Sequence, residues 1–296
     1  MNRYLYTIAY ILFNGASVLA INKVGNQIPV ALMILLGSGY ALLFFHLINI
    51  HQTKKMYRKV WQHKVLYSQT IVVFLLMWCV CFILPVYYTP ALLMFFATAW
   101  PSFFGASTLY LTERKRSSLY LALGIAVVIM GYYLALFSVY PLLRYGLMVL
   151  GTTIAGITMF LYSNLSYRMN QAGFAPSEIL AVRFILLFLV PLFWCIKTHE
   201  IALINVHMLW LTALLSLLSL IIPVYCSQIS IQKIGPNIHT IAMGVTPFVA
   251  FLFELIGLRH QHAISVDGIF ATALVLTILL TKGVFSYATR QRLKKV

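Results

Sequence analysis

The sequence predicts an all-α integral membrane protein with ten transmembrane helices, arranged as two inverted repeats of five helices. Apolar residues make up 62% of the 296 residues and charged residues only 9%, and the mean hydropathy is +0.92. About a quarter of the residues of a soluble protein are charged. This chain lacks the charged residues to cover a surface in water, so we expect lipid to be its solvent.

Ten apolar stretches predict the individual spans, because about 20 apolar residues cross a hydrocarbon core of about 30 Å as a helix. Residues 65–111 contain no Asp, Glu, Lys or Arg, and we divide them between Pro85 and Pro90 because proline disfavours helix in the residue before it. The stretches do not alternate polar and apolar residues, as the strands of a transmembrane β-barrel, the alternative fold, would. The predicted spans are 4–21, 30–50, 65–86, 88–110, 118–138, 145–165, 177–196, 208–228, 237–257 and 265–285.

The connections between these spans are short, so we expect residues 1–296 to form a single membrane domain. An N-terminus inside the cell puts 16 of the 21 Lys and Arg residues inside and four outside, with Arg183 within a span. The positive-inside rule therefore predicts cytoplasmic N- and C-termini in a bacterial inner (plasma) membrane. The net charge of +16 then reflects topology and contacts with anionic lipid, and we expect no nucleic-acid partner.

The N-terminus and the cysteines allow other interpretations. Residues 1–20 combine a basic start, an apolar middle and small residues, so a cleavable signal peptide is an alternative to a first span. Its removal would leave nine spans and disrupt the charge pattern. The cysteines show no disulfide or metal-ligand spacing, and we interpret them as small apolar packing residues within spans: Cys79, Cys81, Cys195 and Cys226.

Recurring prolines predict an internal repeat. Pro90 and Pro101 in the fourth span recur with the same spacing as Pro236 and Pro247 in the ninth. Prolines also open the second and seventh spans. We expect the first repeat over residues 1–138 and the second over 144–296. An odd number of spans per repeat inverts the second repeat relative to the first, and inverted repeats place a substrate site between them near the bilayer midplane.

Ionisable side chains within spans are costly in lipid and usually face the bundle interior or a cavity. Arg183 is either a clamp for a substrate carboxylate, since guanidinium binds carboxylates through two parallel hydrogen bonds, or a tether between helices. Glu254 is a candidate proton-coupling group or an interfacial partner of Arg259. His239 is a candidate proton relay or a packing residue. Asn14 lies mid-span, where an unpaired amide is expensive, and Ser17 shares its helix face.

Four segments resemble the EamA-like branch of the drug/metabolite transporter superfamily. They are NGASVLAINK (14–23), like its first-span signature, ATAWPSFFGASTLYLTERKRS (97–117), like its fourth span, PSEILAVRF (176–184), like the second span of a repeat, and IAMGVTPFVAFLFELIG (241–257), like its ninth span. WPS at 100–102 and TPF at 246–248 look most like the aromatic amino acid exporter subfamily. The sequence departs from the family at Leu258-Arg259 and Leu36-Gly37, where Glu-Arg and Arg-Phe pairs are usual.

This resemblance implies a central cavity lined by the first, third, fourth, sixth, eighth and ninth spans, through which small metabolites move. Further polar and aromatic residues on those spans become candidate substrate contacts, and an aromatic cavity would suit a flat or apolar substrate side chain. Together with Asn14, Ser17, Arg183 and His239, the predicted substrate-binding residues are Trp78, Trp100, Tyr162, Asn164, Tyr225 and Gln228.

The predicted function is secondary or facilitated transport, by alternating access, of amino acids, including aromatic or apolar ones, or of related small metabolites. The sequence contains no nucleotide-binding loop and no hydrolase motif, so we expect no enzymatic activity, cofactor or metal. One alternative is a carrier of S-adenosylmethionine or a nucleoside-like solute on the same fold. Another is an integral-membrane enzyme acting on lipids. We expect membrane lipid and a small-molecule substrate as partners, and a monomer or homodimer.

Overall fold

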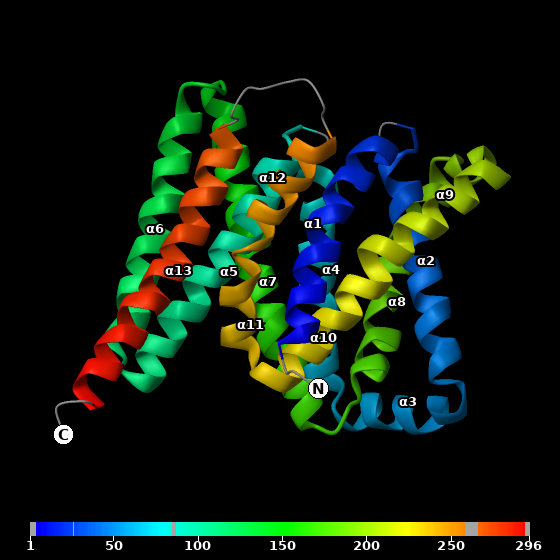
Figure 1. The fold of residues 1–296 in the computed structure, drawn as a ribbon. Coiled ribbons are helices and arrows are strands. Elements are labelled where there is room, and N and C mark those ends of the chain that lie inside the picture. Colours follow the sequence, from blue (N-terminus) through cyan, green and yellow to red (C-terminus); the bar gives the residue numbers. More distant parts are fainter. Residues whose placement is uncertain (1–3, 26, 85–86, 258–265, 294–296) are drawn as a thin grey trace.

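The structure, a computed structural model, describes residues 4–25, 27–84, 87–257 and 266–293 (Figure 1). These residues form helices and turns, with no β-strand among them. The helices are α1 (Leu5–Gly25), α2 (Val30–Ile48), α3 (Thr53–Gln62), α4 (Lys64–Ile83), α5 (Pro90–Glu113), α6 (Arg116–Phe137), α7 (Leu142–Gln171), α8 (Pro176–Lys197), α9 (Val206–Ser216), α10 (Ile222–Ile234), α11 (Pro236–Met243), α12 (Thr246–Gly257) and α13 (Val266–Leu293).

The chain is an all-α, multi-pass membrane protein. Within the described residues, eight helical segments are long and apolar enough to cross a membrane: α2, α4, α5, α6, α7, α8, the run Val206–Ile234 and the segment Pro236–Phe253. The first predicted span falls on α1 and the last on α13, whose apolar part, Val266–Thr281, is shorter. Within the described residues, each of the ten predicted apolar stretches thus falls mainly on helix.

Proline sets several helix boundaries. Pro90, Pro176 and Pro236 each occupy the first position of a helix, where the missing N–H is not needed and the fixed φ favours helix. The side chain of Thr89 caps α5 by accepting a hydrogen bond from the N–H of Leu92 at 3.3 Å. Pro101 lies inside α5 and does not end it.

Two predicted spans are interrupted. The predicted span 208–228 is divided into α9 and α10 by a π-helical turn, η4 (Leu217–Ile221), just before Pro223. Proline lacks an N–H, and its ring clashes with the carbonyl of the residue four positions earlier. The extra residue in the π-helical turn relieves this clash. The predicted span 237–257 is divided between Met243 and Thr246 into α11 and α12.

The helices form a bundle with paired helices at its two edges. In Figure 1, α6 and α13 lie together at one edge, and α2, α8 and α9 at the other. Between them, α1 packs against α10 and α12, α7 packs against α4 and α5, and α5 packs against α11. Figure 1 shows that α1 begins and α13 ends at the same end of the bundle.

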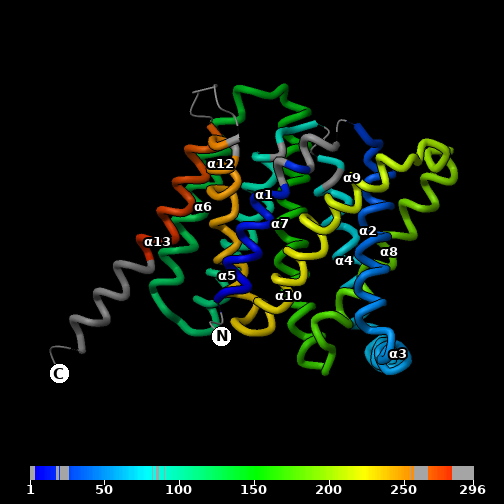
Figure 2. Tube along the Cα trace, turned by 45° about the vertical axis from the view of Figure 1, so that its right-hand side comes forward, coloured from blue at the N-terminus to red at the C-terminus, as the bar shows by residue number. Residues whose placement is uncertain are grey.

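A helix that the apolar pattern did not predict, α3, lies across that same end (Figures 1 and 2). Its buried residue is Met56, whereas Lys54, Lys55 and Arg58 are exposed. Lys59 ties it to the start of α8, because its ammonium contacts the Glu178 carboxylate at 2.6 Å and the carbonyl of Gly173 at 2.7 Å.

Candidate functional site

A cavity of about 120 Å³ lies among the central helices. Its walls come from α1, α4, α5, α7, α8, η4 and α10. The predicted contributions of the first, third, fourth, sixth and eighth spans are therefore present. The prediction was wrong for the ninth span, because the described residues of α11 and α12 do not reach the wall. The seventh span, α8, takes that place and contributes Arg183.

Arg183 alone is charged among the described residues that line this cavity. It lies two turns after the start of α8, a helix that packs against both α2 and α4. Its side chain is 0% exposed. Arginine does not lose its proton in proteins, so the structure holds a buried positive charge in the cavity wall.

Three aromatic rings surround the guanidinium. Its carbon lies 4.6 Å from the ring centroid of Phe74, 4.7 Å from that of Tyr162 and 5.5 Å from that of Phe184. Each ring presents electron density to the cation, and such contacts strengthen when water is excluded. The rings therefore hold the guanidinium plane in place without neutralising its charge.

Hydrogen bonding leaves much of the guanidinium unsatisfied. Nη1 donates to Oε1 of Gln228 at 3.3 Å, and the same oxygen accepts a hydrogen bond from the Tyr162 hydroxyl at 3.1 Å. Within the described structure, Nε and Nη2 of Arg183 and Nε2 of Gln228 are buried without a hydrogen-bond partner. Nε and Nη2 form one edge of the guanidinium, and two parallel N–H groups on such an edge match the two oxygens of a carboxylate.

No carboxylate of the described residues pairs with Arg183. Among the described residues, the ion pairs join Lys59 to Glu178 and Lys115 to Glu113. A buried charge without a partner is strongly destabilising in a membrane or a protein interior. The arrangement therefore favours an anion that comes from outside the protein.

The rest of the wall combines apolar surface with a few hydroxyl and amide groups. On α1, the Asn14 side chain donates to the Tyr10 hydroxyl at 3.1 Å and approaches the Met94 sulfur at 3.8 Å. The Ser17 hydroxyl donates to the Asn14 carbonyl at 2.8 Å. Side chains of the apolar part include Phe74, Met77, Trp78, Leu93, Met94 and Met159. Small-molecule sites commonly combine an apolar lining with a few polar groups in this way.

Five of the sequence-predicted residues line the cavity: Asn14, Ser17, Trp78, Tyr162 and Arg183. Two more lie directly behind the wall. Gln228 is fully buried and holds Arg183 and Tyr162. His239 is fully buried and contacts the lining residue Ser227.

Three predicted residues lie elsewhere. Trp100 packs against Gly156, stacks on Phe104 with centroids 5.7 Å apart and donates from its indole to the Tyr133 hydroxyl at 3.2 Å. Asn164 donates to the carbonyl of the preceding turn, and Tyr225 is partly exposed with its ring 6.2 Å from that of Phe45. The coupling candidate Glu254 belongs to α12, but its side chain lies outside the described part of the structure.

The sequence analysis missed several lining residues. Tyr10 and Phe74 each precede a predicted residue, Asn14 and Trp78, by four positions, and residues at that spacing share a helix face. Helical periodicity was therefore the available signal for both. Ser219 had no such signal, because the π-helical turn that places it in the wall is not visible in the sequence pattern.

The described residues contain no group of three or more His, Cys, Asp or Glu side chains that would hold a metal ion. The site consists of a fixed cation, aromatic rings and hydroxyls around an apolar space. Such an arrangement suits an amphipathic anion, and the hydroxyl of Ser227 in its wall lies 2.9 Å from Nε2 of His239.

Comparisons with known proteins show the fold. No protein-family model and no curated protein matches the chain. Fourteen chains of solved structures match it. One of them, described only as a crystal structure of a protein, superposes with a TM-score of 0.70 at 16% sequence identity, over 94% of this chain and 96% of that one. The helical arrangement therefore occurs in an experimental structure of nearly the same length.

Proposed function

We propose that this protein is a secondary transporter or facilitator that moves small carboxylates across the bacterial inner membrane by alternating access. Amino acids with an apolar or aromatic side chain are the cargo that fits best. The unpaired edge of the buried Arg183 guanidinium carries this proposal, because a carboxylate would complete its hydrogen bonds and offset its charge. The aromatic and methionine wall would receive the substrate side chain.

The fold that we propose for this activity has ten transmembrane helices in two inverted repeats of five, as in the EamA-like branch that the sequence resembles. The helix contacts support it when the first repeat, α1, α2, α4, α5 and α6, is matched with α7, α8, α9–α10, α11–α12 and α13. The contacts of α1 with α10 and α12 then correspond to those of α7 with α4 and α5. The contact of α2 with α9 corresponds to that of α8 with α4, and the α2–α8, α5–α11 and α6–α13 pairs map onto themselves.

The cavity also favours this cargo over the alternatives. A volume of about 120 Å³ suits an amino acid better than S-adenosylmethionine or a nucleoside. An enzyme acting on lipids would need acid or base groups gathered at one membrane face. The described carboxylates are dispersed instead, with Glu113 paired to Lys115, Glu178 to Lys59 and Asp267 bonded to the Tyr132 hydroxyl.

Counterflow in proteoliposomes tests this function. Purified protein is reconstituted with internal unlabelled phenylalanine or leucine, and entry of the labelled amino acid is followed. We expect exchange with phenylalanine and leucine, and none with phenethylamine or phenylalanine methyl ester, which lack the carboxylate. Exchange of S-adenosylmethionine or adenosine without exchange of the amino acids would contradict the proposal.

Arg183→Gln should raise the KM for exchange about a hundredfold, since hydrogen bonds to a charged group contribute up to about 3 kcal/mol. Arg168→Gln, the same change at an exposed position near the end of α7, is the control and should leave exchange unchanged. The thermal stability of substrate-free Arg183→Gln should not fall, because the change removes an uncompensated buried charge. A large loss of stability with normal exchange would identify Arg183 as a tether between helices.

A further inference from the structure

A second buried polar group adjoins the cavity at His239 on α11. The imidazole is 0% exposed, and both of its nitrogens contact serine hydroxyls of α10. Nε2 lies 2.9 Å from the Ser227 hydroxyl and Nδ1 lies 2.9 Å from the Ser230 hydroxyl. The two serines are three residues apart, so they lie on one face of α10 and bracket the ring.

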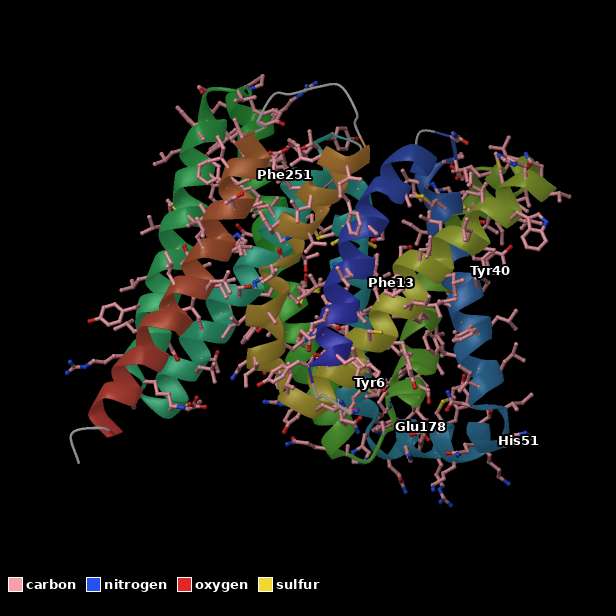
Figure 3. All side chains as sticks on the ribbon, in the orientation of Figure 1. Tyr6, Phe13, Tyr40, His51, Glu178 and Phe251 are labelled. Atoms are coloured by element: carbon pink, nitrogen blue, oxygen red, sulfur yellow. The ribbon has the colours of Figure 1, made fainter. Side chains whose placement is uncertain are left out.

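These contacts form a continuous chain of hydrogen-bonding groups from the cavity to the first helix. Ser227 lines the cavity. On the other side of the ring, the Ser230 hydroxyl lies 2.6 Å from the hydroxyl of Thr7, near the start of α1. In Figure 3, Tyr6 marks that end of α1, the same end of the bundle as His51 and Glu178. The chain therefore leads from the central cavity toward the end where the N-terminus lies.

His239 differs from a histidine that serves only in packing because each of its ring nitrogens contacts a hydroxyl group. A neutral imidazole has one donor and one acceptor nitrogen, whereas an imidazolium has two donors. A carbonyl or carboxylate partner fixes one tautomer. A serine hydroxyl donates or accepts as its proton rotates, so Ser227 and Ser230 satisfy both neutral tautomers and the charged ring without movement of heavy atoms.

The helices around His239 present few groups that compete for a proton. From α1, Tyr10 lies with its ring centroid 5.3 Å from that of the imidazole. From α10, the facing groups are the two serines, while the ammonium of Lys233 lies over the Tyr6 ring. On α5 and α7 the charged side chains lie in the terminal turns: Glu113 on α5, and Arg144 and Arg168 on α7.

Two consecutive residues of α10 connect this ring with the proposed substrate site, because Ser227 contacts His239 and Gln228 contacts Arg183. Gln228, which holds Arg183, follows Ser227 directly in α10. The Arg183 charge opposes a second positive charge on His239 while the cavity is empty. A bound carboxylate removes that opposition, so substrate binding and protonation favour each other, and this linkage is reciprocal.

We propose that His239 is the proton-carrying group that couples substrate movement to a pH gradient, an inference that rests on the proposed transport function. While the cavity is open to the outside, a proton from cavity water passes through Ser227 to Nε2 of the tautomer that carries its hydrogen on Nδ1, which gives an imidazolium. After the cavity opens to the cytoplasm, one proton is released on that side, from Nε2 through Ser227 or from Nδ1 through Ser230 and Thr7. The two neutral tautomers then re-equilibrate by proton exchange through both serines, which restores the starting ring. One proton enters with each carboxylate substrate.

Proteoliposomes test the coupling, with labelled phenylalanine as the probe. Wild type should exchange phenylalanine at equal pH on both sides and concentrate it when the outside is more acidic. His239→Gln and Ser230→Ala should keep equal-pH exchange within about twofold but lose the accumulation. His46→Gln and Ser163→Ala, which alter a histidine and a buried serine outside the chain of contacts, are the controls and should accumulate as wild type does.

Two outcomes overturn the coupling role while leaving the transport function intact. One is wild-type exchange that a pH gradient does not bias. The other is normal accumulation by His239→Gln with its loss in Glu254→Gln, which would move the coupling group to α12.

A measurement without substrate keeps the inference testable even if phenylalanine is not exchanged. In ¹⁵N-histidine NMR spectra of detergent-solubilised protein, the resonances absent from His239→Gln identify the ring. The two serine partners predict ¹⁵N shifts averaged between both neutral tautomers in wild type, and a single tautomer with hydrogen on Nδ1 in Ser227→Ala. A ring fixed in one tautomer in wild type would overturn the relay, whatever the protein carries.

Discussion

At the scale of single residues, the two deep tryptophans have different surroundings. Trp78 lines the cavity, whereas Trp100 packs against Gly156, whose backbone leaves no room for a side chain between them. We therefore expect Trp100→Ala to destabilise the protein by about 3 kcal/mol, typical of removing a large packed aromatic. Thermal unfolding in detergent would measure it, and Trp210→Ala, at a 75% exposed position, should change little. Trp100→Ala with unchanged stability but impaired exchange would return Trp100 to the substrate site.

Three of the predicted residues that line the cavity have a common basis. Asn14, Ser17 and Arg183 are polar side chains within apolar spans, and the cost of exposing them to lipid already directs them inward. Aromatic residues carry no such cost in lipid or in protein. The sequence therefore could not separate Trp78 from Trp100 or Tyr225, because their positions depend on which neighbouring helix lies opposite.

At the scale of helices, an ion pair joins α3 to the start of α8. Glu178 is 1% exposed, and Oε2 accepts hydrogen bonds from Lys59 at 2.6 Å and from the N–H of Ala175 at 2.7 Å. Lys59→Met should destabilise the protein by about 3 kcal/mol, because removing one partner leaves a buried charge unpaired. Lys115→Met breaks the exposed Lys115–Glu113 pair and should have no measurable effect. Equal stability losses in thermal unfolding would refute this difference.

The sequence predicted the helices that apolar length marks for contact with lipid. It did not predict the features that depend on packing against neighbouring helices. Apolar length located every long helix, because backbone groups in lipid must be hydrogen-bonded within a helix. It did not predict α3, which is polar on most of its surface and lies across the bundle end. It also did not predict η4 or the break between α11 and α12, which are local adjustments near prolines within otherwise apolar runs.

At the scale of the whole molecule, the proposed inverted repeats account for the cavity wall and for the position of the two chain ends. The proposed inverted repeats bring α1 and α7, the first helix of each repeat, to the cavity wall, where both contribute lining residues. Two repeats of five spans also require both chain ends on one side of the membrane. In Figure 1, α1 begins and α13 ends at one end of the bundle, and the excess of Lys and Arg predicts that this end is cytoplasmic.

This topology predicts which loops are accessible from outside the cell. His51, at the same end as Glu178 in Figure 3, should be cytoplasmic, and Ser138, in the turn between α6 and α7 at the opposite end in Figure 1, should be outside. In a background with the four native cysteines replaced by alanine, a membrane-impermeant maleimide should label Ser138→Cys in intact cells. It should label His51→Cys only after permeabilisation, which serves as the control for reactivity. Labelling of His51→Cys in intact cells with protection of Ser138→Cys would reverse the orientation, and with it the side of the membrane to which the Thr7–Ser230–His239 chain leads.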